Sequence, residues 1–156
     1  MERRENWEHF LSEFIFKRKD CPFEYGKNDC CLFVADAVEV MTGIDTAEDF
    51  RLQYKSKKEA YNLLYRFSGG YILETVRKLT NAYGMPEIKP SFASRGDVVL
   101  VDGPMGEALG IVDMSGTKIV VPGKKGLTAF PFEVIKKAWR VGYAASSSRS
   151  SRISSR

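Results

Sequence analysis

The sequence contains a single histidine, His9, and this scarcity limits the chemistry that the chain can perform. Many zinc sites and acid–base or nucleophilic catalysts use imidazole, and in this chain each of them would have to use this one residue. His9 follows Trp7 and Glu8 in a segment with the spacing of an amphipathic helix. We therefore expect His9 to be a solvated surface side chain, and we predict neither a metal site nor a cofactor.

The sequence is also poor in cysteine and in long apolar runs. Cys21, Cys30 and Cys31 are odd in number and lack the spacing of a disulfide framework. No apolar run approaches the roughly 20 residues that a membrane-spanning helix needs. The N-terminal charges are not followed by the apolar core of a secretory signal. These absences favour a protein that is made in a reducing cytoplasm.

The excess of positive charge is concentrated at the C-terminus. The net charge is +4, and Arg149, Arg152 and Arg156 account for three of these charges. Residues 146–156 are otherwise rich in serine and cannot build a core. We predict one domain over residues 1–145, followed by a tail that is either solvated or docked on partner proteins through its arginines. Contact between this basic tail and nucleic acid is a further option.

Hydrophobic periodicity divides the domain into a helical half and a strand half. The expected helices are 5–18, 29–42, a short one near 46–54, 57–67 and 71–83. The expected strands are 97–101, 108–112, 118–121, 126–130 and 139–143, with one helical turn over 132–137. Helices followed by strands predict an α+β fold, with N-terminal helices packed on a C-terminal antiparallel five-stranded sheet.

Cys30 lies where a helix is expected to begin. Asn28 and Asp29 are good N-cap residues, and a thiol on the first turn of a helix feels the positive end of its dipole, which favours the thiolate. That is the geometry of a nucleophilic cysteine. The alternative is that Cys30 is a small buried apolar residue. Cys31 lies roughly 100° around the helix, and we expect it to contribute packing.

The residues around Cys30 resemble the NlpC-type branch of the papain-like superfamily, whose members are mostly cell-wall cysteine peptidases. The family's Pro-Tyr-x-Trp-Gly is similar to residues 22–26, Pro-Phe-Glu-Tyr-Gly, and its Asp-Cys-Ser-Gly-Phe/Leu-Val to residues 29–34, Asp-Cys-Cys-Leu-Phe-Val. Its Gly-Asp strand start resembles residues 96–97, and its His-Val-Gly-Ile strand resembles residues 108–111, Ala-Leu-Gly-Ile. The resemblance implies a papain-like fold with Cys30 at the position of the nucleophile.

The same resemblance implies that the catalytic machinery is incomplete. The family's base falls on Ala108, its third polar residue falls near Val120, and the tyrosine that assists the oxyanion falls on Phe23. A cysteine peptidase needs a base near its thiol and an acid to protonate the leaving amine. We therefore expect Cys30 to be a vestigial nucleophile in a degenerate peptidase.

The run from Tyr25 to Asp36 is closer still to short NlpC-like proteins that tailed phages and prophages encode. This resemblance extends to the Ala-Leu-Gly-Ile strand and to residues 138–141, Ala-Trp-Arg-Val. It implies a non-catalytic structural or adaptor component of the virion, in a tail, tail-tip or connector assembly, made in the cytoplasm of the bacterial host. The implied partners are neighbouring virion proteins.

The alternative function is an active cysteine peptidase or amidase that hydrolyses peptidoglycan during phage entry. Cys30 would be the nucleophile, and its base would come from His9 or from another chain.

Several further residues are candidates for structural roles or contacts. We expect Asp36 and Asp45 to make hydrogen bonds at helix ends or turns, and Asp97 to bind backbone at a strand start. Trp139 is expected in the core. Exposed aromatic side chains among Phe92, Phe130 and Phe132 would suit contacts with partner proteins.

Overall fold

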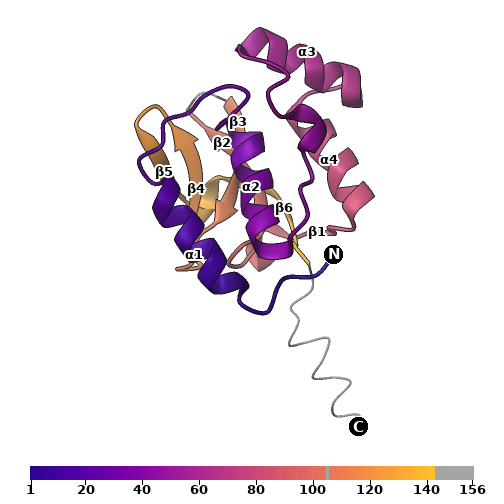
Figure 1. Cartoon of the computed structure of the whole chain (residues 1–156). Coiled ribbons are helices and arrows are strands. Elements are labelled where there is room, and N and C mark those ends of the chain that lie inside the picture. Colours follow the sequence, from indigo (N-terminus) through magenta and orange to yellow (C-terminus); the bar gives the residue numbers. More distant parts are fainter. Residues whose placement is uncertain (105, 143–156) are drawn as a thin grey trace.

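The computed structural model describes residues 1–104 and 106–142, and within these residues four α-helices precede all the strands of the sheet (Figure 1). The helices are α1 (Trp7–Arg18), α2 (Cys30–Thr42), α3 (Lys57–Ser68) and α4 (Ile72–Tyr83). The strands are β1 (Glu87–Ile88), β2 (Val98–Gly103), β3 (Gly106–Val112), β4 (Lys118–Gly123), β5 (Gly126–Pro131) and β6 (Ile135–Trp139). The predicted α+β class is confirmed.

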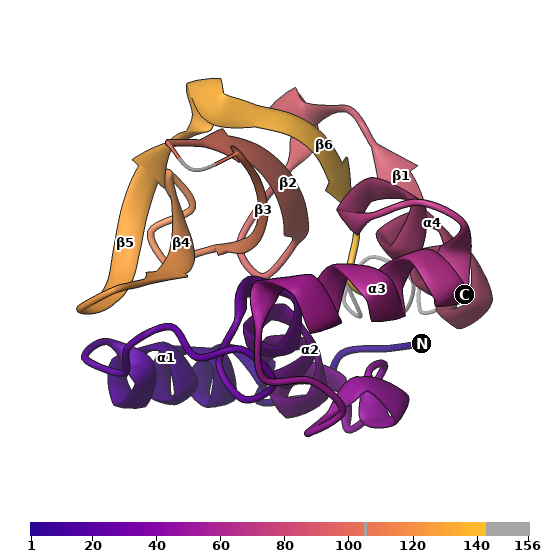
Figure 2. The ribbon, with the colours of Figure 1, turned by 90° about the horizontal axis from the view of Figure 1, so that it is seen from above.

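The sheet is antiparallel, with the strand order β1-β6-β2-β3-β4-β5. Viewed from above, it curves over one side of the molecule and the four helices lie along its other side (Figure 2). This arrangement agrees with the expectation that the helices pack on a C-terminal sheet.

Helix α2 is the central element of the fold because both of its sides are covered. Phe33, Ala37 and Met41 belong to the main core with the sheet, whereas Leu32 and Ala35 belong to a second cluster with residues of the segment after α2 and of α3. Its ends are set by local sequence. Asp29 caps the N-terminus, and the C-terminus stops where the backbone becomes left-handed, at a glycine.

Helix α3 begins at the predicted capping residue. The side chain of Ser56 accepts a hydrogen bond from the Glu59 N–H at 3.2 Å, as a capping box requires. The Glu59 carboxylate reaches one residue further than expected, to the backbone N–H of Lys55 at 2.8 Å. The short helix predicted near 46–54 is reduced to a 3₁₀ turn, Glu48–Phe50.

The prediction of five strands was wrong at two places. Strand β1 has only two residues, too few to show a period, and it pairs with β6 through Glu87↔Trp139 and Ile88↔Ala138. The last strand ends at Trp139 instead of beginning there, and the turn before it is a 3₁₀ turn limited to Phe132–Val134. The chain leaves the strand path because Val141 binds the buried Asp97 carboxylate through its N–H.

A buried ion pair closes the fold. Arg3 donates to the Asp97 carboxylate at 2.9 Å, to the Val141 carbonyl at 2.6 Å and to the Arg95 carbonyl at 2.8 Å. Asp97 is fully buried and also accepts from the backbone N–H of Ser94. The expectation that Asp97 binds backbone at a strand start is thus confirmed, and its arginine partner is a new finding. Burial lowers the pKa of Arg3, and the Asp97 charge opposes that shift.

Candidate functional site

The candidate site is the N-terminal end of α2, and Asp29 organises it. Its carboxylate accepts hydrogen bonds from the Leu32 N–H at 2.9 Å, from the Gly26 N–H at 3.0 Å and from the Tyr54 hydroxyl at 2.6 Å. The start of α2, the turn before it and the segment before α3 are therefore all bound to one carboxylate. The position of Cys30 is fixed by its neighbour because Asp29 caps the helix that Cys30 begins.

The turn before Asp29 depends on a glycine at position 26. Gly26 has φ of +84°, and a Cβ added there would lie 2.1 Å from the Tyr54 carbonyl oxygen. The Gly26 carbonyl also accepts from the Leu52 N–H at 3.2 Å. A side chain would therefore separate the two segments that hold Asp29.

Cys30 and Cys31 carry free thiols side by side at the start of α2. Cys30 is 9% exposed. The pKa of its thiol lies below the ordinary value, chiefly because Cys31 donates a hydrogen bond to the thiolate; burial opposes this shift, and the N–H of Leu109 adds to it. The pKa of Cys31 is raised well above its ordinary value, first because it is that donor and then because it is buried. A thiolate at this site is therefore carried by Cys30.

Cys31 also faces the interior. It lines an apolar cavity of about 60 Å³ together with Leu64, Val76 and Leu109. This placement supports the expectation that Cys31 contributes packing. Cys21 is partly buried, and its thiol lies 3.8 Å from the Lys17 carbonyl in the turn after α1.

Strand β3 brings Leu109 to Cys30, and Ala108 precedes Leu109 on that strand. The methyl group of Ala108 is partly buried and packs against the main core. It can neither accept nor donate a proton. Val120 lies on β4, pairs with Ile111 and is buried. Phe23 is partly buried and packs edge-on against Tyr25, with ring centroids 4.7 Å apart.

His9 does not face this site. Its side chain is 71% exposed on α1, and its Nε2 lies 3.9 Å from a carboxylate oxygen of Glu13. Leu11 and Phe14 are the α1 side chains that point into the core. Cys30 is buried in the same core cluster as those two side chains, whereas His9 is not part of it. The expectation that His9 is a solvated surface residue agrees with this position.

Asp36 and Asp45 are joined by arginine. Arg51 bridges them, at 2.7 Å from Asp36 and 2.8 Å from Asp45, and Arg18 reaches Asp36 at 2.6 Å. Asp45 also accepts from the Ala47 N–H at 3.0 Å, which is the turn bond that was predicted. The Arg51 hydrogen bond lowers the pKa of Asp45. Both carboxylates therefore hold the loop after α2 against the helix.

Three tyrosines near Cys30 were missed by the sequence analysis. Burial raises the pKa of Tyr25, Tyr54 and Tyr61. The next cause is the charge of Cys30 for Tyr25 and Tyr61 and that of Asp29 for Tyr54. Only Tyr25 carried a sequence signal, because it stands at an aromatic position of the resembled motif. Tyr54 and Tyr61 come from later segments and have no such signal.

The remaining candidates divide between the surface, the core and the undescribed tail. Phe92 is exposed, Phe130 and Phe132 are partly buried, and Trp139 is buried as predicted. Arg149, Arg152 and Arg156 lie outside the described residues. Among the residues that are described, no group of three or more His, Cys, Asp or Glu side chains is arranged to hold a metal ion.

No helix within residues 1–104 and 106–142 is both long and apolar enough to cross a bilayer.

Comparison with known proteins gives one family. A family model described as "Domain of unknown function (DUF6950)" matches residues 2–141, a span that contains all the helices and strands described above. No curated protein matches the chain. Because the match covers most of its length, the chain belongs to the DUF6950 family.

Proposed function

We propose that this protein is a non-catalytic structural or adaptor component of a tailed-phage virion, built on a degenerate NlpC-like, papain-like fold. One observation carries the non-catalytic part of the proposal: the strand that reaches Cys30 offers the backbone of Leu109 and the methyl group of Ala108, with no imidazole beside them. The tail, tail tip or connector is the proposed location within the particle.

The papain-like part of the proposal is supported by how α2 meets the sheet. A helix that begins with cysteine packs its N-terminal turn against an antiparallel strand, and the position aligned with the family's base stands next to that contact. The order of helix and strands along the chain is also that of the resembled family. These features support common ancestry with NlpC-type domains.

The chemistry of the site favours a protein that has lost the catalytic activity of its relatives. Acyl transfer from an amide needs a proton donor for the leaving amine, and Ala108 cannot supply one. Phe23 lacks the hydroxyl that would stabilise an oxyanion. Cys30 is also largely covered, so a substrate carbonyl could approach its sulfur only after side chains had moved.

The proposed partners are neighbouring virion proteins. Arg149, Arg152 and Arg156 are proposed to contact them from the tail, and exposed aromatic rings such as Phe92 suit the same purpose. Contact between the tail and nucleic acid is the weaker option. The protein would be made in the cytoplasm of the bacterial host and then be assembled into the particle.

Detection of the protein in purified particles tests this proposal. We expect an antibody against the chain to label the tail or its ends, and we expect particles assembled with Cys30→Ala to be as infective as the wild type. Absence of the chain from purified particles would rule out a virion component. Normal assembly with loss of infectivity in Cys30→Ala particles would show that the thiol itself is needed.

An active cysteine peptidase or amidase remains the second candidate because the pKa of Cys30 is lowered. In that case peptidoglycan would be hydrolysed during entry, and His9 or another chain would be the base. If His9 is the base, His9→Ala would abolish the release of muropeptides by the purified protein. Retained release in His9→Ala together with loss in Cys30→Ala would point to a base from a second chain.

A further inference from the structure

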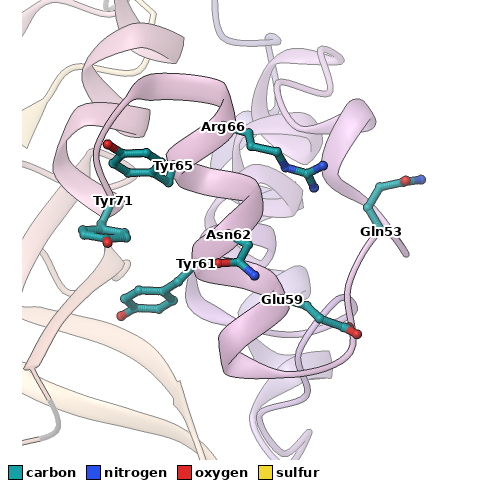
Figure 3. Close-up of a pocket in the computed structure, with 7 residues that line it drawn as sticks. All are labelled: Gln53, Glu59, Tyr61, Asn62, Tyr65, Arg66 and Tyr71. Atoms are coloured by element: carbon teal, nitrogen blue, oxygen red, sulfur yellow. The ribbon is translucent and has the colours of Figure 1, made fainter.

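A groove of about 680 Å³ lies along the exposed face of α3 (Figure 3). Three tyrosines line one side of it: Tyr61 and Tyr65 on α3, and Tyr71 just before α4. The other side is polar and presents Glu59, Asn62 and Arg66 of α3 together with Gln53 of the preceding segment. The groove therefore has an aromatic side and a hydrogen-bonding side, with α3 between them.

The tyrosine rings form a connected platform. The ring of Tyr71 lies 5.4 Å from that of Tyr61 and 5.9 Å from that of Tyr65, with interplanar angles of 36° and 38°. Tyr65 is 57% exposed and Tyr71 is 50% exposed. Aromatic residues normally bury most of their surface, so two half-exposed rings held by a third leave faces on which another flat group can stack.

The surroundings of this platform are basic, although the N-terminal part of the chain is acidic. Residues 55–84, which contain α3 and α4, hold six basic and two acidic side chains, whereas residues 1–54 hold seven basic and twelve acidic ones. Lys57 places its Nζ 5.7 Å from the Tyr61 ring centroid. Lys58 precedes Asn62 by one helical turn on the exposed face of α3, and Arg66 follows Asn62 by one turn.

Only part of this charge is neutralised locally. Glu59 lines the groove, but its carboxylate accepts from the Lys55 backbone N–H. Among the described residues, no ion pair is formed by Lys57, Lys58 or Arg66. Arg66 lines the groove itself, and Lys57 and Lys58 lie beside it on α3, so stacking surfaces and cations that could meet an anionic partner are close together.

We propose that this groove binds single-stranded nucleic acid. Bases would stack on Tyr65 and Tyr71, and the phosphates would follow the cations of α3, while the Asn62 amide faces the base edges or sugars. Stacking on aromatic rings within a positive groove is the general mode of sequence-tolerant single-strand binding. An acidic peptide would match the charge but would leave the tyrosine faces without flat partners. The proposal does not depend on the virion role.

Fluorescence anisotropy of the full chain with a labelled oligodeoxythymidine of about 12 nucleotides tests this inference. We expect saturable binding that weakens as salt rises from about 50 to 200 mM. Tyr65→Ala and Tyr71→Ala should each weaken binding by about tenfold, whereas Tyr65→Phe should bind as the wild type does. Lys58→Gln should weaken binding and lower the salt dependence.

Two controls separate this groove from other sources of binding. Phe16→Ala removes a ring that is 66% exposed on α1 and has Lys19 over it at 4.4 Å, so it is a matched aromatic control and should bind normally. Full-length protein with Arg149, Arg152 and Arg156 changed to glutamine should also bind.

Four outcomes would overturn the inference: no saturable binding at low salt, loss of binding in the tail variant alone, equal weakening by Tyr65→Phe and Tyr65→Ala, or equal competition by polyglutamate. Without saturable binding there is no site, and loss of binding in the tail variant alone would place the binding site in the tail. Equal weakening by Tyr65→Phe and Tyr65→Ala would mean that the Tyr65 hydroxyl, and not its ring, makes the contact. Equal competition by polyglutamate would mean that the surface binds any polyanion. Failure here would not affect the detection of the chain in phage particles.

Discussion

Asp29 is the residue whose carboxylate holds the segments of the candidate site together. It is buried, and its three donors come from the turn before α2, from α2 itself and from the segment before α3. Hydrogen bonds to a charged acceptor are stronger than neutral ones. The position of Cys30 follows from these bonds because Asp29 caps the helix that Cys30 begins. This position suits a side chain that packs in the core, and it also suits a former nucleophile.

Tyr54→Phe tests the contribution of the third donor. Removing a hydrogen bond to a buried carboxylate should lower the free energy of unfolding by about 2 kcal/mol. Urea denaturation followed by circular dichroism would measure the change. Tyr65→Phe is the matched control, because that hydroxyl is exposed, and it should change stability by less than about 0.5 kcal/mol. Equal effects of the two substitutions would mean that the Tyr54 bond contributes nothing specific.

The same tyrosine should make stability depend on alkaline pH. Burial and the Asp29 charge raise the pKa of Tyr54 in the folded protein, whereas in the unfolded chain a tyrosine titrates near pH ~10. Above that pH the unfolded state loses the proton that the folded state keeps, so the contribution of Tyr54 falls as pH rises. The stability difference between wild type and Tyr54→Phe should therefore narrow above pH ~10. A constant difference from pH ~8 to ~11 would contradict this account.

At the scale of elements, the turn and the loop that meet at Gly26 act as one support for α2. Gly26→Ala would place a methyl group against the Tyr54 carbonyl in a left-handed backbone conformation, and it should cost about 3 kcal/mol. Gly69→Ala has a similar φ of +79° but meets no atom within 4 Å, so it should cost only about 1 kcal/mol. Thermal unfolding of both variants would measure the difference. Equal losses would show that backbone strain alone matters.

Elements whose limits are set by local signals were predicted well. Asp29 caps α2, and glycines end α2, α3 and α4, so the cause of each boundary lies within a few residues of it. Strand β1 was missed because two residues carry no period, and it exists only through its partner β6. The last strand was displaced because the chain after Trp139 is drawn into the bonds around Asp97.

The site was predictable only in part for the same reason. Cys30 at a helix start follows from the caps around it, and the resemblance drew attention to Ala108 and Phe23. Tyr54 and Tyr61 reach the site from 24 and 31 residues further along the chain, and their sequence surroundings do not mark them. Arg3 is likewise joined to Asp97 across 94 residues. Contacts between distant segments have no local pattern to reveal them.

At the scale of the whole molecule, the bond between Arg3 and Asp97 ties the N-terminus to the start of β2 and to Val141. Arg3→Met would leave the fully buried carboxylate with Arg140, 3.1 Å away, as its remaining ionic partner. Breaking a buried pair from one side should cost about 3 kcal/mol or more. Chemical denaturation would show the loss, and Arg4→Met, which keeps the pair, should be nearly neutral. A neutral Arg3→Met would mean that Arg140 replaces it fully.

Our central proposal is that the molecule is a degenerate relative of cysteine peptidases that no longer performs their chemistry. Incubation of the purified full-length protein with bacterial peptidoglycan, followed by chromatography of the soluble muropeptides, tests it most directly. We expect wild type and Cys30→Ala to release no more material than a blank without protein. Release by the wild type that disappears in Cys30→Ala would contradict the account and establish an active peptidase or amidase.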